Sequence, residues 1–273
     1  MAAETYTHGH HESVLRSHRW RTVENSAAYL LPHLEPGKSL LDVGCGPGTI
    51  TLDLAGRLAP GRVVGVDPVE DVLVAARADA ADAGATNLTY ETGDVYRLAF
   101  EDGAFDLVHA HQVLQHLADP VAALREMGRV CRDGGWVAAR DSDYSAMTWY
   151  PADPRLDHWL DLYRTVTRRN GGEPDAGRRL LAWAHAAGFD DVSPSAGVWC
   201  YATPAERAWW GDLWADRVTK SAFAASAVES GLADQADLET IADGWRAWAA
   251  HPDGWFIVPS GEVLCRRGPM LRT

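Results

Sequence analysis

Residues 40–49 read LLDVGCGPGT, and this stretch decides the fold of the chain. A short run typical of a buried strand leads directly into a glycine-rich turn, and residues 50–58 continue with a helical pattern. Glycine permits the tight turning and the close ligand approach that such a turn needs. A strand, a glycine-rich loop and a helix in this order are the usual context of a nucleotide-binding loop.

The same alternation continues along the chain. Strand-like runs occupy residues 39–43, 62–66, 88–92, 105–110 and 135–140, and helical patterns at 50–58, 69–83 and 120–130 lie between them. Strands that alternate with helices at this spacing predict βαβ units with right-handed crossovers. The apolar runs are nearly continuous, as expected for strands buried on both faces. We therefore predict an α/β fold with a Rossmann-like, doubly wound sheet.

The remaining segments predict additions to this sheet. Helical patterns cover residues 12–34, 153–169 and 175–187, a strand candidate spans 191–202, and a capping box at 203–206 starts another helix. Two further helical stretches precede a closing strand. We expect an N-terminal helical lid (1–35), a core (36–145, 175–202 and 253–273) and a helical cap over the substrate (146–174 and 203–252).

The glycine loop favours a ligand with a cationic tail. Its spacing is GxGxG, whereas dinucleotide-binding loops have GxGxxG, and Asp42 ends the preceding strand. A carboxylate at this point would repel a pyrophosphate but attract the ammonium group of an amino acid. The loop therefore suits S-adenosylmethionine better than NAD, and an NAD-dependent oxidoreductase is the less favoured alternative.

Two more acidic residues follow the next two strands. Asp67 lies 21 residues after Gly46, where a carboxylate can accept both hydroxyl groups of a ribose. The adjacent Pro68 offers an apolar face to an adenine ring. Asp94 is placed to accept a hydrogen bond from the adenine amino group, with Val95 packed beside it. Each acid alone is more typical of a turn, but their succession at three strand ends indicates a binding site.

The motifs together resemble class I methyltransferases, within them the ubiquinone/menaquinone-biosynthesis branch. The resemblance covers residues 38–142 and is carried by LLDVGCGPGTIT (40–51), VVGVD (63–67), GDV (93–95) and HQVLQHLADPVAALREMGRVCRDGGWV (111–137). It implies a sheet that is mostly parallel with a final antiparallel strand at about 255–266. The N-terminal helices and the Trp-rich second half depart from that branch, which argues against a quinone substrate.

The resemblance also implies which residues contact the cofactor. It points to the glycine loop, to the acids at the strand ends and, through its backbone, to His111; neighbouring loop residues complete the predicted set. The cofactor-binding candidates are Asp42, Gly44, Cys45, Gly46, Asp67, Pro68, Gly93, Asp94, Val95, His111 and Gln112.

Candidates for proton transfer follow the fourth and fifth strands, at the edge where open α/β sheets bind ligands. An oxygen or nitrogen nucleophile often needs a base for methyl transfer. His116 is a candidate, although it can equally be structural, and His111 is more typical of a residue that lines the cofactor pocket. Asp141 and Tyr144 face the same side; solvated loop acids are the alternative there.

The chain contains 12 Trp residues, and many lie in its second half. Trp183, Trp245 and Trp248 are typical of packing between cap helices. Other aromatic rings are expected to line a pocket for a flat, apolar or weakly cationic acceptor. From the N-terminus, Tyr6 and His10 are expected to fold over the site, with a disordered tail as the alternative. The aromatic substrate candidates are Trp149, Tyr150, Trp199, Tyr201 and Trp210.

Composition narrows the class of partner. The net charge of −13 argues against nucleic acid, because binding to phosphates requires Lys and Arg. The four cysteines form no CxxC pair, so neither a disulfide framework nor a metal site is expected. No signal peptide or membrane span is apparent. We expect a cytoplasmic enzyme with a small-molecule substrate; a non-catalytic, regulatory protein that binds the same cofactor is the alternative, and the oligomeric state stays open.

Overall fold

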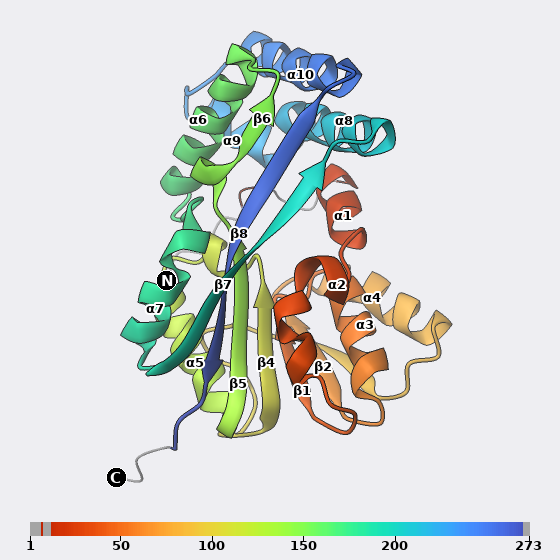
Figure 1. The fold of residues 1–273 in the computed structure, drawn as a ribbon, viewed down its shortest axis with the longest axis vertical. Helices are drawn as coiled ribbons and strands as arrows, with labels where there is room; N and C mark the ends of the chain where they lie inside the picture. The colour runs from red at the N-terminus through yellow and green to blue at the C-terminus, as the bar shows by residue number, and fades with distance from the viewer. Residues whose placement is uncertain (1–6, 8–11, 270–273) are drawn as a thin grey trace.

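The computed structural model describes residue 7 and residues 12–269, and its centre is a mixed sheet (Figure 1). The parallel part has the order β3-β2-β1-β4-β5 and confirms the predicted α/β alternation. These strands are β1 (Leu40–Val43), β2 (Val63–Asp67), β3 (Leu88–Thr92), β4 (Phe105–His111) and β5 (Cys131–Ser142). Because the order reverses between β1 and β4, the carboxyl ends of these two strands flank a crevice.

The antiparallel part is built on one long strand. Strand β8 (Trp255–Arg266) pairs with β5 along one edge, where Val137 is opposite Cys265, and with β7 (Asp191–Tyr201) along the other. The expected antiparallel closing strand is therefore confirmed. The short strand β6 (Thr148–Tyr150), which the sequence did not predict, pairs with β8 beyond the end of β5.

Helices cover both faces of the parallel part. On one face, α5 (Pro120–Val130) and α7 (Leu180–Ala187) pack on apolar strand residues such as Leu41 and Val108. On the other, α2 (Val23–Ser26), η1 (Ala28–His33) and α3 (Thr49–Leu58) pack on Leu40 and Leu107. Helix α4 (Glu70–Asp82) packs on Tyr90 of β3. Alternate residues of each strand thus enter different cores, which is why the strands are apolar throughout.

A group of helices gathers at one end of the sheet, above the carboxyl ends of the parallel strands (Figure 1). It consists of α6 (Pro154–Arg169), α8 (Pro204–Lys220), α9 (Ala222–Glu229) and α10 (Gln235–Ala250). Helix α8 begins at the predicted capping box, in which the Thr203 side chain accepts from the Glu206 N–H and the Glu206 side chain accepts from the Thr203 N–H. Long strands β7 and β8 run from the sheet into this cap.

The cap has its own aromatic core. Trp159 is fully buried and meets Trp214 and Trp245 edge-on, at centroid distances of 4.6 and 4.8 Å. Trp245 and Trp248 are buried here, as the sequence indicated, whereas Trp183 belongs to α7 and packs against the core between the sheet and α5. Edge-to-face indole pairs stabilise such a core beyond the area that they bury.

Shorter elements complete the chain. Helix α1 (Glu12–Arg19) packs against α8, and η2 (Leu114–His116), η3 (Tyr144–Ala146) and η4 (Ala176–Arg179) lie near the carboxyl ends of β4 and β5. None of the helices in the described part of the chain has the length and apolar character needed to cross a membrane.

Replacing Trp159 with Ala tests the cap core. The substitution leaves a cavity between two indole rings and should reduce the free energy of unfolding by about 3–5 kcal/mol. Trp255→Ala, at a ring that is 39% exposed, is the matched control and should cost much less. Denaturant unfolding measures both, and equal losses would contradict the importance of this core.

Candidate functional site

A cavity of about 1030 Å³ lies where the carboxyl ends of the parallel strands meet the cap. It is at the upper end of the range of about 300–1,000 Å³ that is typical of small-molecule sites. Its wall has two parts. The loops after β1, β2, β3 and β4 form a loop half, and residues from α1, η3, β7 and α8 form a cap half.

The glycine loop has backbone angles that favour glycine. Gly44 and Gly46 both have left-handed backbone angles, with φ of 68° and 53°. A Cβ atom at Gly44 would lie 2.4 Å from Cγ2 of Val113, so only glycine fits there. At Gly46 the nearest atom to such a Cβ is Nδ1 of His18, 3.7 Å away. The Gly46 side of the loop is therefore open to the cavity.

Asp67 holds the loop in this shape. One carboxylate oxygen accepts from the Gly46 N–H and the other from the Val69 N–H, both at 3.0 Å. Asp94, at the end of the next strand, accepts from the Tyr96 N–H at 2.9 Å. Each carboxylate oxygen can accept more than one hydrogen bond. Both side chains line the cavity and can therefore also bind hydroxyl or amino groups there.

Asp42 is the most deeply buried of the acids that line the cavity. It is 3% exposed, accepts from Oγ1 of Thr51 at 2.6 Å, and pairs with Nδ1 of His109 at 2.7 Å. Thr51 and His109 were not predicted, because they come from α3 and β4 and no local motif links them to Asp42. A buried carboxylate with these partners provides a fixed negative end for a cationic ligand.

All the predicted cofactor residues reach this one cavity. The acids and glycines form the loop half, and His111 and Gln112 lie at the boundary with the cap half. The lining includes Asp42, Gly44, Cys45, Gly46, Asp67, Pro68, Gly93, Asp94, Val95, His111 and Gln112.

The two histidines that follow β4 differ in their surroundings. His111 is 6% exposed, and neither ring nitrogen has a hydrogen-bond partner among the described residues. Burial and the nearby Arg21 and Arg140 guanidinium groups hold the pKa of His111 well below its ordinary value. Burial and Arg21 lower the pKa of His116 to about 3, and its Nε2 lies 3.0 Å from Nε2 of Gln115. Both rings line the cavity as neutral imidazoles.

Of the two candidates after β5, only Tyr144 lines the cavity. Its ring stacks on Tyr163 at a centroid distance of 4.1 Å, and burial raises its pKa. Asp141 is fully buried behind the wall and accepts from the Gln115 N–H at 3.1 Å. Burial raises the pKa of Asp141 to about 7. Asp141 therefore supports the η2 segment and does not face the cavity.

The aromatic substrate candidates divide between the cavity and the cap. Trp199, Tyr201 and Trp210 line the cavity. The ring of Trp149 stacks on Phe256 in the cap core at 5.6 Å, and Tyr150 is 56% exposed on the surface. The structure does not bring these last two rings to the cavity. Tyr6 and His10 lie outside the described residues.

The cavity also contains residues that sequence reasoning missed. Arg21, from the turn after α1, donates to Oε1 of Gln112, and Arg217 of α8 donates to Oγ of Ser17 at 2.9 Å. Trp20 packs edge-on against Trp199 at 5.4 Å. Arg21, Arg217 and Trp20 reach the site because α1 packs between the loop half and the cap. Neither α8 nor the turn after α1 carries a sequence motif that indicates this packing.

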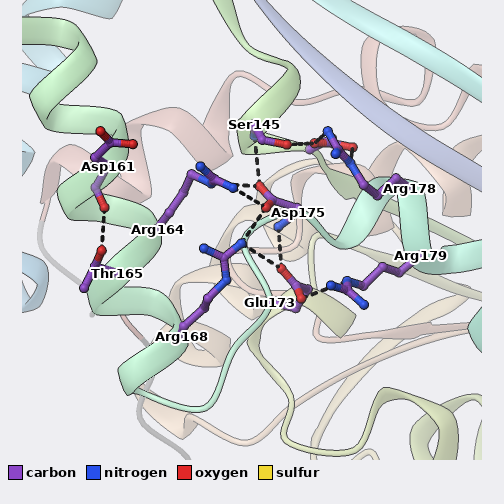
Figure 2. Close-up of polar contacts among 10 residues, drawn as sticks. Ser145, Asp161, Arg164, Thr165, Arg168, Glu173, Asp175, Arg178 and Arg179 are labelled. Carbon is purple, nitrogen blue, oxygen red and sulfur yellow. Dashed lines mark hydrogen bonds and ion pairs between the residues drawn. The ribbon is translucent and has the colours of Figure 1, made fainter.

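An ion-pair network supports the wall from behind (Figure 2). Asp175 accepts from Arg164 at 2.9 Å, from Arg168 at 2.5 Å and from the Ser145 N–H at 2.9 Å. In the same segment, the Glu173 N–H donates to the Gln115 carbonyl at 2.8 Å. The neighbouring Pro174 carbonyl accepts from the Tyr144 N–H at 3.1 Å. Residues 173–175 therefore hold two cavity residues, Gln115 and Tyr144, in place.

The described residues contain no group of three or more His, Cys, Asp or Glu side chains that could hold a metal ion. Within that part of the chain, the site offers carboxylates, imidazoles, guanidinium groups and aromatic rings. These groups suit an organic ligand with a cationic end and hydroxyl groups.

Comparisons with known proteins agree with this geometry. The model of a family described as "Methyltransferase domain" matches residues 34–192. An uncharacterised methyltransferase of Schizosaccharomyces pombe is 33% identical over 271 residues, which is 96% of each chain. The demethylmenaquinone methyltransferase of Lactococcus lactis is 33% identical over 42% of this chain and 46% of its own.

Among solved structures, the fold resembles phosphoethanolamine N-methyltransferase 2 of Haemonchus contortus bound to phosphomonomethylethanolamine and S-adenosylhomocysteine. The TM-score is 0.56 at 16% identity, and the match covers 89% of this chain and 52% of that one. At this identity the likeness concerns the fold.

Asp175→Asn tests the supporting network. Burial raises the pKa of Asp175, but hydrogen bonds from Arg164 and from the Ser145 N–H outweigh it, so the net pKa is lowered. A lowered pKa contributes stability that is present above the unfolded value and is lost as the pH falls through the folded value. At pH 7 the variant should lose about 1–3 kcal/mol of unfolding free energy, and this difference should shrink below about pH 4.

Asp161→Asn is the matched control, because it removes an exposed carboxylate from the same helix as Arg164. Unfolding in urea between pH 3 and pH 8 measures both variants. Equal stability of the two variants at pH 7 would show that the network does not hold the wall.

Proposed function

The chain belongs to the class I S-adenosylmethionine-dependent methyltransferases, and we propose that its substrate is a small aromatic or apolar molecule methylated at oxygen, nitrogen or carbon. The methyltransferase of Schizosaccharomyces pombe matches nearly the whole chain, and the cofactor of this family is S-adenosylmethionine. The partial match to menaquinone methyltransferases agrees with the resemblance of residues 38–142. The family membership sets aside the NAD-dependent alternative; the acceptor is the proposal.

One observation carries the proposal: a single cavity joins the glycine loop with its acids to a cluster of aromatic rings. At about 1030 Å³ it is at the upper end of the range for small-molecule sites, which supports a cofactor and an acceptor side by side. The rings of Trp199, Tyr201, Trp210 and Trp214 are among those that line the cap half. Flat apolar molecules pack well on such rings.

The chain's own groups divide the work of cofactor binding. Asp42 is placed for the positive amino-acid end, and Asp67 and Asp94 for the ribose and the adenine. The open side of Gly46 leaves room for close backbone approach. When bound, S-adenosylmethionine supplies an electrophilic methyl group on a positively charged sulfur. Methyl transfer is an in-line displacement, so holding the acceptor in position is the main contribution of the cap half.

His111 is the group best placed to take a proton from the acceptor. It lines the cavity at the boundary of the two halves, its ring nitrogens have no partner among the described residues, and its low pKa keeps it neutral. The other candidates are less suited to accept a proton. The ring of His116 lies against Gln115, and Asp141 lies behind the wall. The raised pKa of Tyr144 keeps its phenol protonated. A neutral imidazole can accept a proton, and the lowered pKa makes this ring a weaker base than an exposed histidine. A positioned base typically contributes about 10²–10⁴-fold to the rate.

Helix α1 and the turn after it serve as the lid in this proposal. The His18 carbonyl accepts from Oγ1 of Thr49 at 3.0 Å, which ties the lid to the glycine loop. Ser17 accepts from Arg217 of the cap, and Trp20 packs on the cap-side rings. A segment that contacts both halves can exclude water once both ligands are bound.

A thermal-shift titration tests cofactor binding. S-adenosylmethionine and S-adenosylhomocysteine should each raise the melting temperature of the purified protein, because a ligand that binds the folded state stabilises it. NAD should not. Asp67→Ala should weaken both shifts, while Asp79→Ala, an exposed acid on the helix that follows, should leave them unchanged. A shift with NAD alone, or equal shifts in both variants, would contradict the assignment.

A second experiment tests His111. The protein is incubated with S-adenosylmethionine and a panel of hydroxylated and aminated aromatic compounds, and S-adenosylhomocysteine release is measured. With the compound that turns over, His111→Asn should lower the rate about 10²-fold or more and leave the cofactor thermal shift intact. His158→Asn, at an exposed histidine of α6, is the control.

The pH dependence separates His111 from its nearest rival. Since the pKa of His111 lies well below 6.5, the wild-type rate should stay level as the pH falls through that value. A loss of rate centred near pH 7 would contradict this assignment and would instead indicate protonation of Asp141, which supports the η2 segment and has a pKa of about 7.

A further inference from the structure

The charges that line the cavity are separated between its two halves. The carboxylates in the lining belong to the loop half, at or after the carboxyl ends of its strands, and are Asp42, Asp67, Asp94 and Asp119. The arginines in the lining are Arg21 and Arg217, from the turn after α1 and from α8. In the described part of the chain, the cap half therefore presents positive charge and no carboxylate to the cavity.

Arg217 is held in a buried and aromatic setting. It is 4% exposed, its guanidinium lies 4.6 Å from the centroid of the Trp214 ring, and it donates to Ser17. A cation in such a setting attracts an anion placed next to it more strongly than a cation in water does, because the surroundings screen the charge less. A guanidinium next to an aromatic plane is also pre-organised to bind a planar carboxylate with two hydrogen bonds.

Arg21, in the turn after α1, adds a second positive charge. Its guanidinium lies 5.6 Å from the centroid of the Trp199 ring, and its bond to Gln112 fixes it beside the end of β4. Burial raises the pKa of Tyr144 and of Tyr201, and both arginines act on each phenol in the lowering direction. The positive field of the pair therefore reaches across the cap half.

Two neutral hydrogen-bond donors in the same wall independently indicate a ligand with acceptor atoms. Tyr201 is 1% exposed and Trp210 is 5% exposed, and their rings stack at a centroid distance of 4.3 Å. Neither the Tyr201 hydroxyl nor the Trp210 Nε1–H has a hydrogen-bond partner among the described residues. An indole N–H can only donate. Leaving such groups unsatisfied costs free energy, so both point to a ligand rich in acceptor atoms.

We propose that the methyl acceptor is an aromatic anion, a molecule whose ring packs on Trp199, Tyr201 and Trp210 and whose carboxylate-like group binds Arg217 and Arg21. This inference rests on the proposed function and specifies its substrate class. A cationic acceptor, which aromatic rings alone would also suit, is disfavoured because two guanidinium groups repel it and no lining carboxylate of this half attracts it. In this arrangement the negative charge of the acceptor lies in the cap half, away from the carboxylates of the loop half.

Three matched probes test the charge preference: 2-naphthoate, 2-naphthamide and 2-naphthylmethylammonium. Each is titrated into the protein saturated with S-adenosylhomocysteine, and binding is followed by calorimetry. The carboxylate should bind at least about tenfold more tightly than the amide, because hydrogen bonds to charged groups are the stronger ones. The ammonium should bind more weakly than both. Equal binding of carboxylate and amide, tighter binding of the ammonium, or no binding of the carboxylate would overturn the proposal.

Variants connect the preference to the two arginines. Arg217→Gln should reduce the ratio of carboxylate to amide affinity at least about fivefold, with S-adenosylhomocysteine affinity retained as the sign of an intact fold. Arg21→Gln, at a half-buried position, should reduce the same ratio and serves if the first variant does not fold. Arg246→Gln, which removes an exposed charge from α10, should leave the ratio unchanged.

The outcomes for the two proposals are distinct. An unchanged ratio in both cavity variants overturns the aromatic-anion inference while the cofactor assignment stands. Failure of the wild-type protein to bind S-adenosylhomocysteine overturns the proposed function itself, whatever the naphthyl probes do.

Discussion

The pairing of β8 with three other strands is the constraint on which the site depends. Its residues 260–266 pair with β5 of the sheet, its residues 255–257 pair with β6, and β7 runs along its other edge. Backbone hydrogen bonds therefore run without interruption from the sheet into the cap. Because Trp199 and Tyr201 belong to β7, this ladder places the aromatic wall above the glycine loop. A cap joined only by flexible loops would not hold two halves of a cavity in register.

Within the loop half, the same groups provide structure and recognition. Asp67 accepts the Gly46 and Val69 N–H groups, so the carboxylate that faces the cavity also fixes the turn beside it. Asp42 is held by Thr51 and His109 in the same way. Binding groups that are already oriented lose little freedom when a ligand arrives, and this is the usual origin of tight binding in rigid sites. The carboxylates of the cofactor side are thus held in place by the chain itself.

Burial leaves the imidazole and the guanidinium groups that line the cavity in different charge states. It lowers the pKa of His111 and so leaves the imidazole neutral, with Arg21 and Arg140 acting in the same direction. Arginine keeps its charge under the same conditions. One buried environment can therefore contain both a neutral imidazole and positively charged guanidinium groups. Electrostatic interactions in such an environment are also screened less than in water.

Sequence alone determined the parallel sheet, the glycine loop and the acids that follow its strands. These features are local: an apolar run, a glycine turn and a strand-end acid lie within a few residues of each other, and parallel strands must end at one edge. The capping box at Thr203 and the antiparallel closing strand were predicted on the same kind of signal, the latter with the help of the family resemblance.

Only the tertiary structure decided which distant segments complete the site. Arg21 and Arg217 meet the cavity because α1 packs between the loop half and α8. Trp149 and Trp199 are both aromatic residues in strands, yet only Trp199 lines the cavity, whereas Trp149 stacks on Phe256 in the cap core. That choice depends on which face of β8 and which helices each ring meets. Contacts between residues nearly 200 positions apart arise from packing, and no local pattern along the chain records them.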